Sequence, residues 1–298
     1  MDNVLTLISN PADGALGSAD VDKARIALEK LGAETSPADW LSKDEAADIE
    51  FDLVAPESSE AAVRQALNNK PIDVIAQTTL RRKKKLIIAD MDSTIVSGET
   101  LDDLAEFAGL KDKIAEITAR AMNGEMDFFE ALKARVAMLE GLSEDFMEET
   151  MKDVQLNPGA KELIGTMRVH GAHTGLISGG FSYFTDRVRE QVRFHMSLGN
   201  KLEIIDGKLT GKVIPPVVTK DTKHDMLIDM ASQRELGMTD TMAIGDGAND
   251  VPMLKAAGMG IAYHGHSVAR KNANARLDHG DLTGALFIQG YRRDEFVF

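Results

Sequence analysis

Residues 86–94, with the sequence LIIADMDST, decide the fold of this chain. An uninterrupted apolar run leads into two acids, Asp90 and Asp92, which are separated by a single residue. A short apolar run bounded by turn residues is typical of a strand that is buried on both faces of a parallel sheet. The stretch therefore predicts a buried strand that delivers two carboxylates at its C-terminal end.

Three more apolar runs follow along the chain, at 174–177, 241–244 and 258–262. The first of them leads into Ser178-Gly179-Gly180, and the second into Gly245-Asp246-Gly247. Helical segments separate the runs, and this alternation predicts an α/β fold with a buried parallel sheet. Because open sheets of this kind bind ligands at the carboxyl ends of their strands, the polar residues there are candidate site residues.

Residues 97–155 have strong helical character and few strand signals. A helical insert that begins directly after the first strand of the sheet would lie over the carboxyl edge as a lid. We therefore expect a helical cap at about 97–155.

The first 80 residues show a different pattern from the rest. Apolar stretches at 4–8, 49–54 and 72–76 favour strands, and helical spacing lies between them. This order predicts a small α+β domain of ferredoxin-like type at 1–80, followed by a second domain at 81–298. The basic run from Arg81 to Lys85 marks the boundary, and we interpret it as a solvated lead-in to the buried strand.

The composition restricts the partners of the protein. Its 298 residues include 34 basic and 48 acidic side chains, which give a net charge of −14. This charge disfavours nucleic acid and anionic membranes. No apolar run approaches the length of a membrane span, no secretory signal is evident, and no cysteine is present. We therefore expect a cytoplasmic protein in which any phosphate site carries its own local positive charge.

Two acidic turns point to a metal site. Asp90 and Asp92 follow one strand, and the turn GDGAND at 245–250 follows another. Either one alone is compatible with an ordinary turn or a helix cap. Together, at two strand ends of one sheet, they favour a hard cation such as Mg²⁺, which prefers oxygen ligands. The SGG turn at 178–180 offers a hydroxyl and backbone N–H groups to a phosphate, whereas Lys223 alone is typical of a solvated surface.

The segments DMDST, SGGF, Lys223 and GDGAND, in this order, resemble the motifs of the haloacid-dehalogenase superfamily. The resemblance extends from about residue 86 to residue 262, and within that superfamily the pattern is similar to that of the phosphoserine phosphatases. It implies a Rossmann-like parallel sheet with a helical cap. The first 80 residues resemble the variable regulatory-type domains, ferredoxin-like or ACT-like, that some of these enzymes carry.

The resemblance also implies a role for each matching residue. Asp90 is the expected nucleophile and Asp92 the expected general acid and base. The implied cofactor is Mg²⁺, held by Asp90, the backbone carbonyl of Asp92 and Asp246, with Asp250 in support. The residues implied for binding the phosphoryl group and the substrate are Ser178, Gly179, Gly180, Lys223 and Asn249.

The chemistry of these residue types agrees with such roles. A carboxylate that approaches a phosphate is repelled, by about 4 kcal/mol for two unit charges at ~4 Å and an effective dielectric near 20. Mg²⁺ and Lys223 would reverse the sign of this interaction. A serine alkoxide is a poor leaving group and needs a proton from a positioned acid, for which Asp92, beside Asp90, is the candidate.

Residues of the expected cap would select the alcohol. Glu99 is able to bind an ammonium and Arg135 a carboxylate. Without the resemblance, a helix N-terminal acid and a surface arginine are the simpler interpretations. The resemblance places both residues in a phosphoserine site, and it places Phe128 and Met122 at apolar positions that shield the site. Ordinary packing inside the cap is the alternative for these two.

We therefore predict an enzyme, a phosphoserine phosphatase of the last step of serine biosynthesis. The expected partner is a small phosphomonoester, without nucleic acid or membrane, and a homodimer is a compatible assembly. One alternative is a related phosphatase or phosphotransferase for another phosphomonoester. Another is an amino-acid sensor that uses the fold as a switch, against which the intact set of Asp90, Asp92, Lys223 and Asp246 argues.

Overall fold

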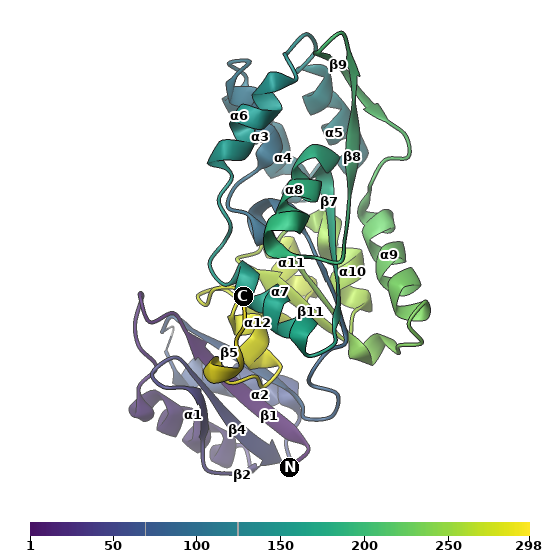
Figure 1. Ribbon diagram of the computed structural model, residues 1–298. Helices are drawn as coiled ribbons and strands as arrows, with labels where there is room; N and C mark the ends of the chain where they lie inside the picture. Colours follow the sequence, from purple (N-terminus) through teal and green to yellow (C-terminus); the bar gives the residue numbers. More distant parts are fainter. Residues whose placement is uncertain (69, 124) are drawn as a thin grey trace.

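The computed structural model describes residues 1–68, 70–123 and 125–298, except for the side chain of Phe128. The described chain contains a five-stranded sheet near the N-terminus and a seven-stranded sheet in the larger part of the molecule (Figure 1). A group of helices lies at the end of the molecule opposite the N-terminal sheet (Figure 1). No helix in the described part of the chain is long and apolar enough to cross a membrane.

The N-terminal sheet has the strand order β2-β4-β1-β5, with β3 also paired to β4, and every pair is antiparallel. The chain is ferredoxin-like, β-α-β-β-α-β, if the short strands β2 and β3, which both pair with β4, are counted as one divided strand. The sequence prediction misses β2 and β3, because strands this short carry too little periodicity to be recognised. The elements are β1 (Asn3–Ser9), α1 (Ser18–Lys30), β2 (Glu34–Thr35), β3 (Asp39–Ser42), β4 (Ala46–Asp52), α2 (Pro56–Ala66) and β5 (Ile72–Thr78).

The seven-stranded sheet has the order β12-β11-β10-β6-β7-β8-β9, and all neighbours except β8 and β9 are parallel. In β6, Ile87 and Ala89 join the core on one face of the sheet, and Leu86 and Ile88 join the core on the other. This double burial explains the apolar run, and it confirms the predicted α/β fold. The strands are β6 (Leu86–Ala89), β7 (His173–Phe181), β8 (Met196–Ile205), β9 (Lys208–Ile214), β10 (Thr241–Gly245), β11 (Met259–Tyr263) and β12 (Ala275–Leu277).

Helices cover both faces of this sheet. Buried side chains of α7, α8 and α12 belong to the core on one face, and those of α9 and α10 to the core on the other. The arrangement leaves the carboxyl ends of the parallel strands free to carry polar residues. The helices are α7 (Ala160–Val169), α8 (Ser182–Val192), α9 (Lys220–Ser232), α10 (Val251–Ala256), α11 (Ser267–Asn272) and α12 (Gly284–Ile288).

In the described part of the chain, four α-helices follow β6 and precede α7, and Figure 1 shows them beside the long β8–β9 hairpin. They lie within residues 97–155, which we call the cap. Buried residues such as Leu104, Ile114 and Leu132 pack these helices together. The helices are α3 (Thr100–Glu106), α4 (Lys111–Met122), α5 (Phe128–Ala137) and α6 (Asp145–Asp153).

The second face of the N-terminal sheet packs against the C-terminal part of the chain. Ile8 and Ile75 of this face share a core with Leu286 and Phe287 of α12. The buried carboxylate of Asp73 accepts hydrogen bonds from the backbone N–H groups of residues 278–280. The N-terminal sheet is therefore covered on both faces, by α1 and α2 on one side and by the segment around α12 on the other.

The basic run at the start of β6 is part of this interface. Arg82 donates to both carboxylate oxygens of the buried Asp48, at 2.5 and 2.8 Å, and to the hydroxyl of Thr6. Lys84 is buried and donates to the backbone carbonyls of Arg81 and Thr239. The interpretation of this run as a solvated lead-in is therefore wrong for Arg82 and Lys84, because tertiary contacts bury them.

We predict that Arg82→Ala lowers the free energy of unfolding by about 3–5 kcal/mol, since it leaves the buried Asp48 carboxylate without its partner. Arg81→Ala is the matched control. Arg81 pairs with Asp240 but its side chain is 54% exposed, so its loss should cost less than about 1 kcal/mol. Urea unfolding of the two variants measures both values, and equal small losses would contradict the burial argument.

Candidate active site

Asp90 lies directly after β6 and is buried, with its carboxylate against a lysine. Asp90 Oδ1 is 2.8 Å from Lys223 Nζ, and the same Nζ is 2.6 Å from Asp250 Oδ1. Burial and the Asp250 carboxylate raise the pKa of Asp90 to about 7, although Lys223 opposes this shift. Burial alone would lower the pKa of Lys223, but Asp250 and Asp90 outweigh it and raise that pKa above its usual value. Lys223 is therefore a fully charged cation beside Asp90.

Local hydrogen bonds place Lys223 in the first turn of α9. The side chain of Thr219 accepts from the backbone N–H of Thr222, and the Thr222 hydroxyl accepts from the backbone N–H of Thr219. This reciprocal cap begins the helix immediately before Lys223. Lys223 therefore reaches Asp90 from a helix far from β6 along the chain, and for this reason the sequence alone does not distinguish it from a surface lysine.

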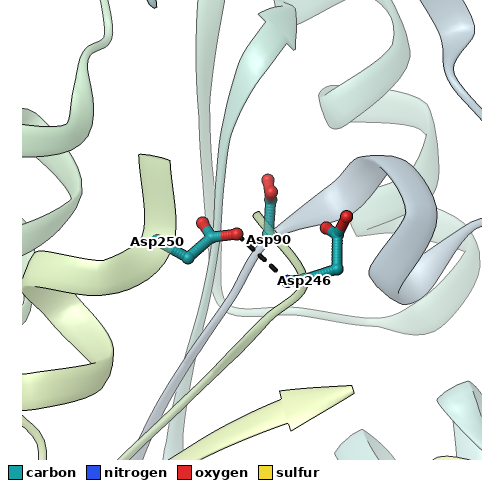
Figure 2. Close-up of side chains that lie close together, drawn as sticks. All are labelled: Asp90, Asp246 and Asp250. Atoms are coloured by element: carbon teal, nitrogen blue, oxygen red, sulfur yellow. Dashed lines mark hydrogen bonds between the residues drawn. The ribbon is translucent and has the colours of Figure 1, made fainter. Parts of the chain in front are cut away.

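Three carboxylates meet at the ends of β6 and β10. Oxygens of Asp90, Asp246 and Asp250 lie within 4.8 Å of one another (Figure 2). Asp250 uses both of its oxygens, since Oδ1 accepts from Lys223 and Oδ2 accepts from the backbone N–H groups of Asp246 and Gly247. Asp250 is therefore suited to holding the turn and the lysine.

Asp246 has an oxygen with no partner. Its Oδ1 accepts from the hydroxyl of Thr94, whereas the buried Oδ2 has no hydrogen-bond donor in the described structure. Burial and the carboxylates of Asp250 and Asp90 raise the pKa of Asp246 well above its usual range. An orphaned buried oxygen amid other carboxylates fits a hard divalent cation such as Mg²⁺, which would offset the repulsion.

The Asp92 carboxylate points away from these three and toward the SGG turn. Its Oδ1 accepts from the backbone N–H of Thr100, at the start of α3, and its Oδ2 accepts from the hydroxyl of Ser178. Burial raises the pKa of Asp92. At Gly180 a Cβ atom would lie 2.6 Å from Asp92 Oδ2, so this approach requires glycine. These contacts hold the Asp92 carboxyl group at the SGG turn, outside the cluster of Asp90, Asp246 and Asp250.

Most of the predicted site residues line one cavity of about 20 Å³. That volume is enough for a water molecule. Lys223 and Asp246 lie next to the cavity, in contact with Asp90 or in its carboxylate cluster, and the side chain of Phe128 lies outside the described part of the chain. The lining residues are Asp90, Asp92, Glu99, Leu101, Met122, Leu132, Arg135, Ser178, Gly179, Gly180, Phe181 and Asn249.

The cap contributes one cation and one acid to this cavity. Arg135 is 4% exposed and donates to the hydroxyl of Thr118. Glu99 accepts from the hydroxyl of Ser93. Burial and the carboxylates of Asp92 and Asp246 raise the pKa of Glu99 well above its usual range. Both residues face the cavity, whereas the residue types alone favoured a surface position for Arg135.

Sequence reasoning missed the residue that holds the SGG turn. Asn200 of β8 is buried, donates to the carbonyl of Gly179 and accepts from the backbone N–H of Val218. The local sequence gave no signal for Asn200, because the burial of this asparagine within a strand is visible only in the structure. Asn249, which was predicted, has a buried Oδ1 with no partner in the described structure, and this leaves it free to bind a ligand.

Comparison with known proteins agrees with this geometry. A family model described as haloacid dehalogenase-like hydrolase matches residues 87–255. The phosphoserine phosphatase of Streptococcus thermophilus is 44% identical over 199 residues, which are 67% of this chain and 93% of that protein. The phosphoserine phosphatase of Streptomyces coelicolor is 38% identical over 240 residues, 80% of this chain and 58% of that protein. The chain thus spans little more than half the length of some curated relatives. For the phosphoserine phosphatase SerB2 of Mycobacterium tuberculosis, the matched region covers 52% of that protein.

Solved structures give the same result. A phospho-aspartyl intermediate analogue of phosphoserine phosphatase superposes with a TM-score of 0.67 at 35% identity, over 69% of this chain and 98% of that one. The unliganded structure of a probable phosphoserine phosphatase from Vibrio cholerae superposes with a TM-score of 0.76 at 29% identity, over 99% of this chain and 88% of that one. The family model and these relatives together show that this chain belongs to the haloacid dehalogenase-like hydrolase family.

Proposed function

We propose that this protein is a Mg²⁺-dependent phosphoserine phosphatase that uses Asp90 as its nucleophile. One observation carries the proposal. A single cavity holds Asp90, the acid Asp92, and an arginine, Arg135, that has no carboxylate within 4.0 Å in the described part of the chain. The relatives named phosphoserine phosphatase, and the solved phospho-aspartyl analogue of such an enzyme, support it.

We propose that Mg²⁺ is held by Asp90, Asp246 and the backbone carbonyl of Asp92, with Asp250 holding the turn. When bound, Mg²⁺ supplies positive charge that lets a carboxylate approach a phosphate dianion. Lys223, whose Nζ is 2.8 Å from Asp90 Oδ1, adds a second positive charge. Because burial strengthens electrostatic interactions, these charges act strongly on the phosphoryl oxygens.

The two acids have complementary tasks in this mechanism. An Asp90 oxygen attacks phosphorus, the bond from phosphorus to the serine oxygen breaks, and Asp92 donates a proton to that oxygen. A water molecule then attacks the aspartyl-phosphate while Asp92 takes its proton, and the bond from phosphorus to Asp90 breaks. The raised pKa of Asp92 supports its first task, since a buried carboxyl retains a proton more readily.

Substrate choice would rest on the cap. We propose that Arg135 binds the carboxylate of phosphoserine and that Glu99 binds its ammonium. A buried guanidinium without a carboxylate partner is costly, and a substrate carboxylate would remove that cost. The ammonium would do the same for the Glu99 carboxylate, whose ionised form is disfavoured by burial and by neighbouring acids.

Residues 1–80 provide none of the residues that line the cavity. We propose that they form a unit of their own, with a role in regulation or assembly rather than in the chemistry. The reaction would supply serine, and the absence of cysteine is compatible with an enzyme of the cytoplasm.

The proposed substrate is tested by phosphate release from a panel of phosphomonoesters. We expect phosphoserine to be hydrolysed fastest, and activity to disappear when EDTA removes Mg²⁺ and to return when Mg²⁺ is restored. An enzyme that prefers another member of the panel would overturn the substrate assignment, and EDTA-resistant hydrolysis would overturn the metal assignment.

Asp90→Asn should lower kcat by at least about 10⁴-fold, because the amide keeps the shape but is no nucleophile. Asp294→Asn, at an exposed acid far along the chain, is the control and should leave kcat unchanged. Rapid acid quenching with ³²P-labelled phosphoserine should trap base-labile protein label in the wild type only. Full activity of Asp90→Asn would exclude the covalent mechanism.

Arg135→Ala should raise KM for phosphoserine about 10–100-fold, because a hydrogen-bonded charge pair is lost. Hydrolysis of an aryl phosphate, which has no carboxylate, should change little. Arg120→Ala removes an exposed arginine of the same cap and serves as the control. Equal losses of kcat/KM on both substrates would show that Arg135 has a structural or catalytic role instead.

A further inference from the structure

The position of Arg135 depends on two other helices of the cap. Its Nη1 donates to the hydroxyl of Thr118 on α4, at 2.8 Å, and that hydroxyl donates to Oδ1 of Asp102 on α3, at 2.7 Å. A third contact joins Arg135 Nε to the carbonyl of Ala131 within α5 itself. The network thus ties the guanidinium to all three helices that surround it.

Every member of this network is buried. Arg135 is 4% exposed, Thr118 is 4% exposed and Asp102 is 8% exposed. Burial raises the pKa of Asp102, although Thr118 and Arg135 oppose this shift, and burial lowers the pKa of Arg135, although Glu99 and Asp102 oppose this one. Both ionised groups are therefore held where water does not stabilise them, and each stabilises the other only partly.

The hydroxyl of Thr118 separates the two charges. Glu99, Asp102 and Asp92 are close enough to act on Arg135 electrostatically, yet none of their oxygens lies within 4.0 Å of a guanidinium nitrogen. Two opposite charges at ~4 Å attract by about 4 kcal/mol at an effective dielectric near 20. A direct pair inside the cap would therefore compete with any carboxylate that a substrate brought to Arg135.

A purely structural link between helices is the simpler interpretation, but it does not explain the composition of this one. The Thr118 hydroxyl is already 3.0 Å from the carbonyl of Ile114, the usual partner of a threonine inside a helix. This contact already satisfies the hydroxyl inside its own helix, without a buried carboxylate or a buried guanidinium. Apolar residues of similar volume would join the three helices at least as stably. A role in fixing the direction of the Arg135 guanidinium for a ligand would explain why Asp102 and Arg135 are buried together.

We propose that Thr118 and Asp102 are positioning residues, which aim the Arg135 guanidinium at the substrate carboxylate and keep it from pairing directly with the acids of the cap. This inference rests on the proposed function. Asp102 holds Arg135 through the hydroxyl, so the guanidinium keeps a fixed direction and still has unused donors for the substrate.

The matched control lies in the same cap. Thr150 of α6 is 2% exposed, and its hydroxyl donates to the carbonyl of Phe146, four residues earlier. It is thus a buried helical threonine with the ordinary helix contact but without the link to a carboxylate and a guanidinium. Thr150→Val and Thr118→Val remove the same atoms from similar surroundings, so a difference between them isolates the link.

Steady-state kinetics of the full chain with phosphoserine and with an aryl phosphate test the proposal. Thr118→Val should raise KM for phosphoserine about tenfold with kcat little changed, since one hydrogen bond to a charged group is lost. The ratio of kcat/KM for phosphoserine to that for the aryl phosphate should fall by the same factor. Thr118→Ser, which keeps the hydroxyl, should restore the wild-type ratio, and Thr150→Val should leave it unchanged.

The effect should also depend on Arg135. In an Arg135→Ala background, Thr118→Val should cause no further change in that ratio, because the group that Thr118 positions is absent. Aryl phosphate hydrolysis and the melting temperature report whether each variant is folded.

Three outcomes would overturn the inference. In the first, Thr118→Val lowers kcat/KM equally on both substrates, as a structural role predicts. In the second, it leaves the ratio unchanged although the wild type hydrolyses phosphoserine. These two outcomes leave the proposed function intact, whereas a wild-type protein that is inactive on phosphoserine would overturn the proposed function and this inference together.

Discussion

The contact of one buried ammonium with two buried carboxylates is the interaction on which the site depends. Lys223 joins Asp90, which follows β6, to Asp250, which follows β10. Three ionised groups without this pairing would be strongly disfavoured inside the protein. The pairing instead holds α9 and two strand ends together, and it leaves Asp90 beside a fixed positive charge. The packing of α9 against the two strand ends and the charge beside Asp90 therefore have a common origin.

The close approach of backbone segments gives the site its small size. Gly180 lies where a side chain would overlap the Asp92 carboxylate, and Gly245 lies where a side chain would overlap Asp250. Asn200 holds the carbonyl of Gly179 from the neighbouring strand. These contacts bring backbone N–H groups and carboxylates close together at the carboxyl ends of the parallel strands. This edge is where open sheets of this kind bind ligands.

The sheet and the cap divide the work of the site. The strand ends and α9 supply the carboxylates, the lysine and the glycine turn, which meet at or beside one cavity. The cap supplies Glu99 and Arg135, which face the same cavity. In the proposed function, this pair would bind the carboxylate and the ammonium of phosphoserine.

The sequence by itself determined the buried strands and the acids at their ends. Continuous apolar runs such as 86–89 have few other stable arrangements, since both faces must be covered. Only the tertiary structure decided which isolated residues meet. Lys223, Asn200 and Thr118 lie far from Asp90 along the chain, and nothing in their local sequence distinguishes them from surface residues. The same holds for Arg82, which looked solvated until the N-terminal sheet buried it. The local pattern of apolar and polar residues indicates which faces of a strand or helix are buried. A contact between side chains that are distant in the sequence depends instead on how all the elements between them pack.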